Sequence, residues 1–374
     1  MNGDVVIPCQ EISSPEALCR HPLVSVVMLA YNHAAYIREA LEGVLMQETD
    51  FAFELLVGED CSTDETRAIC LDYQRRHPDR LRVLTSQENV SLGISGNLLR
   101  VCRRCRGTFV AMCEGDDCWT DRAKLKKQVA YMKAHPDCTV CFHPARVVWG
   151  DGDHPDSFVP AQPARYRNRT IRLAELLHGN FIPTSGVLYR WNADGRLFDE
   201  FPVYALPGDW LLHLLHARAG TIGFLDETMS IYRRNKGSVW SGDWIDEYWF
   251  ERLGLRVALF YATVERLFHV SRGSRLVPLV LATAAILLER IETPRNAEKL
   301  SRLWTIRRPA AVWVRLSPLL ALVGRVLAVL APSALRPAFA RRFTMWQIVA
   351  ARRKLLLPVL RERLQRPPAG EEGR

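Results

Sequence analysis

The sequence lacks an uninterrupted apolar run of about 18 residues, the length that a membrane-spanning helix requires. We therefore predict no helix that crosses a membrane. The N-terminal segment also lacks an apolar core, because Asp4, Pro8, Glu11 and Pro15 interrupt it. That pattern argues against a secretory signal peptide and predicts a weakly ordered leader over residues 1–21.

Cysteine is absent after Cys141, and all ten cysteines lie between Cys9 and that position. Without a predicted secretory leader, this distribution is typical of reduced thiols and predicts a cytoplasmic location. Two pairs, Cys102 with Cys105 and Cys138 with Cys141, have the internal spacing of a zinc site. The pairs lie further apart than in the usual zinc ribbon, so we favour buried hydrophobic roles and keep structural zinc as the less favoured alternative.

Acidic residues are scarce in the C-terminal part of the chain. Residues 270–374 contain 20 Lys and Arg against 6 Asp and Glu, whereas residues 1–269 contain 30 against 35. Prolines divide this basic, Leu-rich part, and we expect short helices over 246–366 and a flexible tail over 367–374. Such helices suit either the surface of an anionic membrane or a bundle packed on the rest of the chain, and both alternatives stay open.

The basic region contains no recognisable nucleic-acid recognition motif, and its arginines are interleaved with leucines. We therefore predict no nucleic-acid partner. A zinc-dependent nucleic-acid binder is the less favoured alternative, which tight, salt-sensitive binding with stoichiometric zinc would support.

Short apolar runs alternate with amphipathic helical patterns in the first half of the chain. This alternation predicts an α/β fold with a mostly parallel sheet flanked by helices. The expected strands are 23–30, 53–58, 81–84, 107–112 and 139–143, and the expected helices begin near residues 37, 62, 97 and 120. In the last of these helices Leu125, Val129 and Met132 share the apolar side, and we place Lys124 off that side.

The second half of the sequence has a weaker pattern. Residues 150–169 are rich in Pro, Asp and Arg, and we expect a long loop there. The remaining expected elements are helices over 171–177 and 211–219 and strands over 185–190, 221–225 and 229–233.

Three carboxylates, Glu114, Asp116 and Asp117, follow directly after the strand expected over residues 107–112. Packing them together costs like-charge repulsion, which a divalent cation relieves, and their hard oxygen ligands suit Mg²⁺ or Mn²⁺. The end of a strand in an α/β sheet is also where ligands tend to bind. We therefore predict a metal site here, with a solvated acidic turn that caps the next helix as the alternative.

Several motifs stand in an order that matches a known family. They are Val26–Asn32, Gly58–Asp64, Asn89 with Gly93 and Asn97, and Glu114–Trp119. With them, the segment from Pro22 to His143 resembles the donor-binding half of family 2 glycosyltransferases of the GT-A fold. The resemblance extends more loosely through Gly208-Asp209-Trp210 and Tyr232-Arg233 to Trp240. It implies a glycosyltransferase domain over 22–245, with a donor half over 22–143 and an acceptor half over 144–245.

The resemblance implies an enzyme that moves a sugar from a nucleotide-diphosphate donor, with a UDP-sugar favoured, to a hydroxyl group with inversion at the anomeric carbon. The implied acceptor is a saccharide or a lipid-linked molecule, as in bacterial surface-polysaccharide or glycolipid biosynthesis. With the basic region on a membrane, the implied location is peripheral, on the cytoplasmic face of the inner membrane. The alternative is an inactive nucleotide-sugar-binding scaffold of the same fold, which donor binding without transfer would favour.

The implied cofactor is Mg²⁺ or Mn²⁺, which would offset the charge of the departing diphosphate. The resemblance implies Asp116 as the first metal ligand, and Asp117 as a ligand through water or a group that orients the site. Glu114 occupies the first position of the family's Asp-x-Asp pattern, which here becomes Glu-x-Asp. Its longer side chain would reach either the metal or the ribose of the donor.

Asp60 matches the family carboxylate that binds the nucleotide base, and helix capping is its alternative role. Tyr31 lies in the turn after the first strand, where it would pack against the base or fill an ordinary packing position. Asn97 would contact ribose or phosphate, or cap its own helix, and we favour a capping role for Asp64. The implied donor-binding residues are Ala30, Tyr31, Asn32, Asp60, Gly93, Asn97, Glu114 and Arg233.

Asp209 matches the family's catalytic carboxylate, at the start of a helix that faces the sugar of the donor. There it would take the proton of the acceptor hydroxyl, with N-capping as the alternative role. A helix N-terminus is expected to lower its pKa, which keeps it ionised but weakens it as a base. Many relatives carry a His where this chain has Asn235. We expect nearby basic residues to neutralise the phosphates instead, namely Arg233, Arg234 and Lys236.

Overall fold

The chain is described from a computed structural model. The structure describes residues 9–89, 94–150, 155, 157–191, 201, 206–234, 253–270 and 280–283, with a few single positions beyond them. The chain divides into two compact units, Met1–Ser241 and Gly242–Arg374.

The second unit contains the described helix α9 (Leu255–Phe268), which buries Val257, Ala258 and Phe260 among others. Across the described ranges, no helix is both long enough and apolar enough to cross a membrane. Most of the region expected to form short basic helices, and the tail over 367–374, lie outside the described residues. Its two alternatives, membrane surface and packed bundle, therefore stay predictions.

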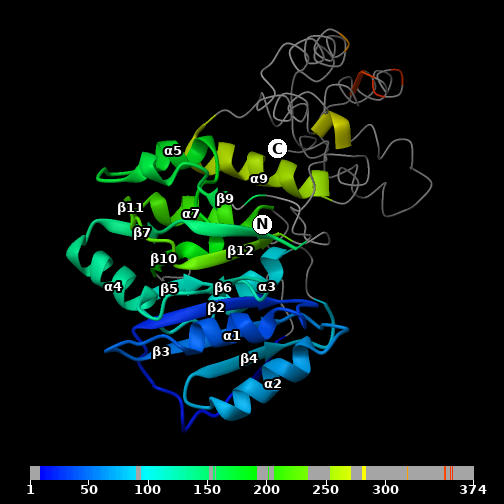
Figure 1. Cartoon of the computed structure of the whole chain (residues 1–374). Helices are drawn as coiled ribbons and strands as arrows, with labels where there is room; N and C mark the ends of the chain where they lie inside the picture. Colours follow the sequence, from blue (N-terminus) through cyan, green and yellow to red (C-terminus); the bar gives the residue numbers. More distant parts are fainter. Residues whose placement is uncertain are drawn as a thin grey trace, which may run out of the picture. The chain divides into compact units, whose positions relative to one another are not determined.

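The large sheet of the first unit has the strand order β1-β4-β3-β2-β5-β10-β7-β11 (Figure 1). The strands β4, β3, β2 and β5 are parallel, as their apolar runs predict, and β7 is parallel to β11. β10 runs antiparallel between β5 and β7, a direction that an apolar run does not reveal. The strands are β1 (Gln10–Ile12), β2 (Val24–Ala30), β3 (Phe53–Glu59), β4 (Leu81–Thr85), β5 (Phe109–Met112), β7 (Cys138–Phe142), β10 (Val187–Arg190) and β11 (Thr221–Phe224).

Helices cover both faces of this sheet. Val24, Val26 and Met28 of β2 share a core with the apolar sides of α1 (Ile37–Leu45), α2 (Thr66–Arg76) and α4 (Lys124–Ala134). A side chain added at Gly58 of β3 would instead meet α3 (Ile94–Cys102), so α3 lies on the opposite face. α3 also contacts α7 (Gly208–Ala217), which packs against β7 and α5 (Leu173–His178). The result is the α/β architecture that the sequence predicts.

A second sheet has the order β6-β12-β8-β9. Its strands are β6 (Cys118–Trp119), β8 (Ala145–Trp149), β9 (Ser157–Val159) and β12 (Ser230–Arg234). The long loop expected over 150–169 therefore contains β9 and the 3₁₀ helix η1 (Pro163–Tyr166), and β8 precedes it. These strands are short, so they form through pairing with neighbouring strands rather than because of a local sequence pattern. β12 pairs with β6, which places Arg233 beside the residues that follow β5.

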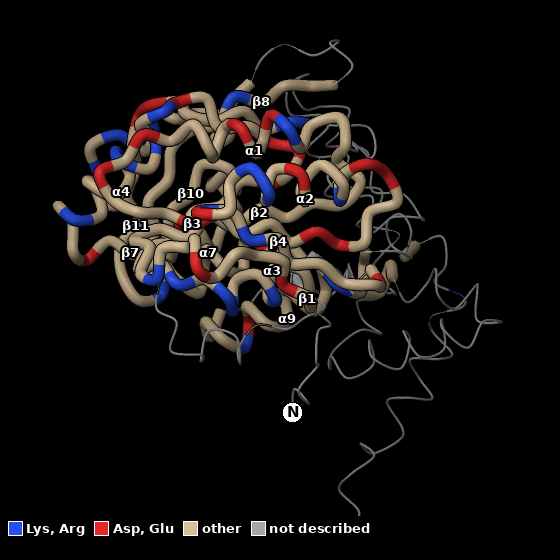
Figure 2. The backbone as a smooth tube through the Cα atoms, turned by 90° about the horizontal axis from the view of Figure 1, so that it is seen from below, with Lys and Arg blue, Asp and Glu red and all other residues tan. Residues whose placement is uncertain are grey.

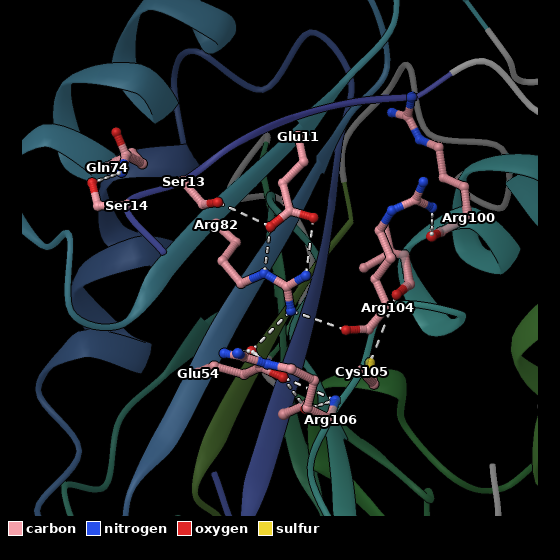
Figure 3. Close-up of polar contacts among 12 residues, drawn as sticks. Glu11, Ser13, Ser14, Glu54, Gln74, Arg82, Arg100, Arg104, Cys105 and Arg106 are labelled. Carbon is pink, nitrogen blue, oxygen red and sulfur yellow. Dashed lines mark hydrogen bonds and ion pairs between the residues drawn. The ribbon is translucent and has the colours of Figure 1, made fainter. Parts of the chain in front are cut away.

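The leader predicted to be weakly ordered contains an edge strand, which corrects the prediction for Gln10–Ile12. β1 pairs antiparallel with β4, and Arg82 of β4 donates to both carboxylate oxygens of Glu11, at 2.8 and 3.0 Å. Arg82 also donates to Glu54 of β3 at 2.9 Å, and Arg106 donates to the same oxygen (Figure 3). Side chains distant in sequence thus hold β1, and no periodic pattern predicts them.

Segments with Lys or Arg and segments with Asp or Glu are both scattered along the described backbone (Figure 2). Several form surface ion pairs, such as Arg76 with Asp72 at 3.0 Å and Arg122 with Glu48 at 3.1 Å. Exposed pairs of this kind add little to stability, so the fold depends on its apolar layers.

Candidate active site

The turn after β2 is held by the turn after β3. Asn32 adopts a left-handed backbone conformation with φ of 54°, and its side-chain oxygen accepts the Thr63 N–H at 2.8 Å. Its own N–H donates to the Ser62 hydroxyl at 3.1 Å. The preceding Tyr31 is 43% exposed, so its ring is open to a planar ligand rather than packed in the core.

Asp64 joins the same two turns. One carboxylate oxygen accepts the Ala34 N–H and the other accepts the Thr66 N–H, both at 3.0 Å. Thr66 begins α2, so Asp64 satisfies backbone donors at the helix start, the role that the sequence favours. Ser62 and Thr63, which could also cap this helix, bind the Asn32 turn instead.

Asp60 lies at the end of β3 and is almost fully buried. Its N–H donates to the Ala30 carbonyl at 3.0 Å, which ties the ends of β2 and β3 together. The guanidinium of Arg100 lies 4.0 Å from its carboxylate, so Asp60 faces a buried positive charge. Sequence reasoning missed Arg100, although its position three residues after Asn97 on the expected helix placed both on one side.

Asn97 connects α3 to β3. Its side-chain amide donates to the Gly58 carbonyl at 2.8 Å, and its oxygen accepts the Arg100 Nε–H at 2.8 Å. This arrangement uses both ends of the amide inside the protein, which favours a structural role over contact with ribose or phosphate. Gly93, the neighbouring expected donor residue, lies outside the described residues.

The acidic tip, defined here as Glu114, Asp116 and Asp117, follows β5 as predicted. Asp117 is buried, and Glu114 and Asp116 are partly exposed. Burial and the charges of Asp116, Asp117 and Asp209 raise the pKa of Glu114 well above its usual range. Burial and the charge of Asp116 raise the pKa of Asp117 in the same direction. Both carboxyl groups therefore bind a proton more readily than an exposed carboxyl group does, unless a cation lies beside them.

Arg233 of β12 lies against the acidic tip. Its backbone N–H donates to Asp117 Oδ1 at 3.0 Å, and its guanidinium donates to the Asp116 carbonyl at 3.1 Å and also pairs with Glu39. This brings Arg233 to the expected site from more than a hundred residues along the chain. Arg234 lies over the Trp149 ring, 5.0 Å from its centre, and Asn235 and Lys236 lie outside the described residues.

His33 is a site residue that sequence reasoning missed. Its Nε2 lies 4.0 Å from Asp116 Oδ2, and its Nδ1 has no hydrogen-bond partner among the described residues. A side chain at Gly115 would lie 2.7 Å from that Nδ1, so only glycine allows the tip to approach the ring. The sequence did carry a signal for His33, because it directly follows Tyr31 and Asn32 in the turn after the first expected strand.

Asp209 lies in the first turn of α7 and is partly exposed. Its Oδ2 accepts hydrogen bonds from the Thr184 hydroxyl at 3.2 Å and from the Asn180 amide at 3.3 Å. Burial raises the pKa of Asp209, and this effect outweighs the hydrogen bonds from Trp210 N–H, Thr184 and Asn180. The lowered pKa expected from the helix N-terminus is therefore wrong, because desolvation is the larger effect.

The carboxylates of the acidic tip and of Asp209 affect the pKa values of the same groups. The charge of Asp209 adds to those of Asp116 and Asp117 in raising the pKa of Glu114. Burial and the same three carboxylates raise the pKa of Tyr232 to about 12. The two parts of the expected site therefore face one region of the first unit.

The residues of the acidic tip fit a divalent cation only in part. Among the residues that the structure describes, Asp117 Oδ2 is buried and has no hydrogen-bond partner, and Asp116 is accessible, which suits a cation. In the described part of the chain, however, no three His, Cys, Asp or Glu side chains are grouped so as to hold a metal ion. A bound cation would therefore take most of its ligands from a second molecule or from water. The cysteines weighed as zinc ligands are free, on or near α3 and on β7.

Comparison with solved structures identifies the class of fold. Staphylococcus aureus TarS 1–349, solved with UDP-GlcNAc, superposes with a TM-score of 0.51 at 19% identity and 91% coverage of each chain. The mannosyltransferase PcManGT from Pyrobaculum calidifontis, solved with GDP-Man and Mn²⁺, gives a TM-score of 0.50 at 17% identity, covering 89% of this chain and 87% of that one. The protein therefore has the GT-A transferase fold that the sequence predicts.

Sequence comparison then gives the family. The model of Glycosyl transferase family 2 matches residues 25–198. Rv1520 of Mycobacterium tuberculosis is 39% identical over 254 residues, covering 67% of this chain and 70% of that protein. TuaG of Bacillus subtilis, a candidate teichuronic acid biosynthesis glycosyltransferase, is 27% identical over 224 residues, covering 60% of this chain and 83% of TuaG. The chain belongs to glycosyl transferase family 2 and is a glycosyltransferase.

Proposed function

We propose that the protein is a metal-dependent inverting glycosyltransferase that moves a sugar from a nucleotide-diphosphate donor to a hydroxyl group. The observation that carries this proposal is the shared electrostatic environment of the acidic tip and Asp209. A UDP-sugar is the favoured donor, because TarS was solved with UDP-GlcNAc, although PcManGT was solved with GDP-Man.

In this proposal the ends of β2 and β3 bind the nucleotide. Tyr31 packs on the base, and Asp60 accepts a hydrogen bond from it while the Arg100 guanidinium lies 4.0 Å from the aspartate. Ala30 and Asn32 fix the turn that carries Tyr31. Their conformations support the assignment, because each is held by hydrogen bonds within the protein.

Asp116 and Asp117 would hold Mg²⁺ or Mn²⁺, with Glu114 close to the metal or the ribose. The cation, when bound, offsets the negative charge that develops on the diphosphate as it leaves. Arg233 adds a fixed positive charge at the same place. PcManGT, solved with Mn²⁺ and its donor, supports this assignment.

Asp209 takes the proton of the acceptor hydroxyl. The hydroxyl oxygen forms a bond to the anomeric carbon while the bond from that carbon to the diphosphate oxygen breaks, and the proton moves to the Asp209 carboxylate. Attack opposite the leaving group inverts the anomeric centre. The raised pKa of Asp209 makes it a stronger base than an exposed aspartate.

A screen of nucleotide-sugars tests the proposal. We expect one donor among UDP-, GDP- and dTDP-sugars to raise the melting temperature with Mn²⁺ or Mg²⁺, because a ligand that binds only the folded state stabilises it. Asp116→Ala should lose the metal-dependent part of this shift, whereas Asp72→Ala on α2 should keep it. Asp209→Asn should keep the shift but lose release of nucleoside diphosphate by about a hundredfold or more.

The outcomes of this screen separate the alternatives. Equal stabilisation of the wild type and Asp116→Ala would remove Asp116 from the metal site. Unchanged turnover by Asp209→Asn would remove Asp209 as the base. Donor binding by a wild type that releases no diphosphate with any acceptor or with water would indicate the inactive scaffold.

The wider role is part of the same proposal. We assign the glycosyltransferase domain to residues 22–245 and the acceptor to saccharides or lipid-linked molecules of cell-surface polysaccharide or glycolipid biosynthesis. The name of TuaG supports that class of product. The basic region over 246–366 would hold the enzyme peripherally on the cytoplasmic face of the membrane.

A further inference from the structure

A three-residue 3₁₀ turn, η2 (Thr184–Gly186), lies between the two parts of the proposed site. On one side, the Thr184 hydroxyl donates to Asp209 Oδ2 at 3.2 Å. Asn180, on the loop before η2, donates to the same oxygen at 3.3 Å. Because Oδ2 accepts both bonds, the orientation of the carboxylate is fixed relative to η2.

On its other side, η2 faces the acidic tip. Ser185 is fully buried, and its hydroxyl donates to the Ser230 hydroxyl at 3.2 Å. Ser230 begins β12, the strand that also brings the Arg233 N–H to Asp117. Consecutive residues of one turn thus contact Asp209 and the strand that donates a hydrogen bond to Asp117.

The backbone of η2 is rigidly held. The indole of Trp119 donates to the Ser185 carbonyl at 2.9 Å, and the Gln128 amide donates to the Gly186 carbonyl at 2.9 Å. A Cβ at Gly186 would lie 2.6 Å from the His143 carbonyl oxygen, so the turn is seated directly on the end of β7. A turn held by three neighbouring groups can keep the two sides of the proposed site at a fixed distance from each other.

We propose that η2 sets the spacing between the donor side and the acceptor side of the site, with Thr184 positioning Asp209 and Ser185 positioning β12, the strand whose Arg233 N–H donates to Asp117. The proposal rests on the function proposed above. It assigns neither residue a contact with substrate: Thr184 acts through Asp209, and Ser185 acts through β12.

The acceptor side is tested with Thr184→Val, which keeps the shape and removes the donor. We expect diphosphate release to fall about tenfold or more in kcat, with the KM for the donor unchanged, and Thr184→Ser to restore it. The acidic limb of the pH profile should move to higher pH, because a lost donor destabilises the ionised carboxylate. Three other titratable groups face Asp209, namely Glu114, Tyr189 and Tyr232, and the raised pKa values of the two tyrosines keep both out of the acidic limb.

The matched control is Thr221→Val, because the Thr221 hydroxyl donates to Asp137 at 3.1 Å away from the site. It should leave kcat and the pH profile unchanged. Asn180→Ala removes the second donor to Asp209 from an exposed position, together with the bond that the Asn180 oxygen accepts from the Ile182 N–H. It gives an independent readout should Thr184→Val fail to fold. It should shift the pH profile in the same direction.

The donor side is tested with Ser185→Ala. We expect it to reduce the melting-temperature shift produced by Mn²⁺ with UDP, or with the diphosphate that the donor screen selects. Thr184→Val should keep this shift, as should the control Ser13→Ala, whose hydroxyl donates to Glu11 at 3.0 Å. We therefore expect Thr184→Val to impair diphosphate release and Ser185→Ala to impair the metal-dependent melting-temperature shift.

Two further results decide the proposal. In the Asp209→Asn background, Thr184→Val should have no additional effect, because Thr184 acts through Asp209. Suppose that Asp209→Asn is inactive while Thr184→Val and Asn180→Ala keep normal kcat values and pH profiles. That result would overturn the role of η2 and leave the proposed function intact. Full activity of Asp209→Asn would instead remove Asp209 as the base, and with it the mechanism proposed above.

Discussion

Lys124 is fully buried at the start of α4. Its ammonium lies 3.8 Å from the centre of the Trp119 ring and donates to Gln128 Oε1 at 2.8 Å. Burial lowers the pKa of Lys124 to about 7, because the charged form loses its hydration. Trp119 and Gln128 also donate hydrogen bonds to the backbone of η2, so both side chains link Lys124 to that turn.

We expect Lys124→Met to raise stability at pH 7 and to flatten its dependence on pH. In the wild type the unfolded chain binds a proton that the folded protein has released between pH of about 7 and about 10.5, so stability rises with pH across that window. The slope from this residue is about 1.4 kcal/mol per pH unit. Melting temperatures at about pH 7 and 9 check this, with exposed Lys126→Met as the control. An unchanged slope in Lys124→Met would show that Lys124 is not the residue responsible.

Some site residues could be read from the sequence and others could not. Glu114, Asp116 and Asp117 were predictable because they follow a recognisable buried strand. Thr184 gives no such signal, because its partner Asp209 is 25 residues away and the contact depends on how β10 and α7 pack. The burial of Lys124 was missed for the same reason, since a helical pattern that places it off the apolar side does not show that Trp119 covers it.

At the scale of elements, β1 depends on the ionic cluster that Arg82 forms with Glu11 and Glu54. Glu54 is also bound by Arg106 and by the Ser25 hydroxyl, the latter at 2.6 Å. Removing one partner of a buried pair leaves the others uncompensated, which costs more than the pair itself contributes.

We therefore expect Arg82→Met to reduce the free energy of unfolding by about 3 kcal/mol, measured by urea denaturation. Arg80→Met is the matched control, because Arg80 pairs with Asp79 on the surface at 3.1 Å and should change stability by less than about 1 kcal/mol. Equal effects of the two substitutions would mean that the cluster does not hold the sheet edge.

Elements with a buried apolar run were predictable, and short edge elements were not. The strands β2, β3, β4, β5 and β7 lie within a residue or two of their expected ranges. β8 and β9 were not expected, because five and three residues with partial exposure carry no clear period. α3 begins at Ile94 rather than near Asn97, and a helix with glycine inside its first turn is disfavoured by propensity alone.

At the scale of the whole molecule, the basic C-terminal region predicts binding to anionic membranes. We expect the full chain to co-sediment with phosphatidylglycerol vesicles and not with phosphatidylcholine vesicles. Salt of about 0.5 M should weaken this binding, because it screens the attraction between arginine and the headgroups. No binding to either vesicle at low salt would favour the alternative of a helical bundle packed on the rest of the chain.

The reversed direction of β10 has a consequence for where chemistry enters this fold. In a parallel sheet each strand delivers its last residues to the ligand-binding edge, and β5 does so with the acidic tip. β10 runs the other way, so its beginning arrives at that edge, and the residues just upstream of it become neighbours of the residues just downstream of β5 and β7. Functional residues in this topology can therefore lie just before a reversed strand as well as just after a parallel one. Substitutions before the reversed strand offer a second way to change the activity of such an enzyme.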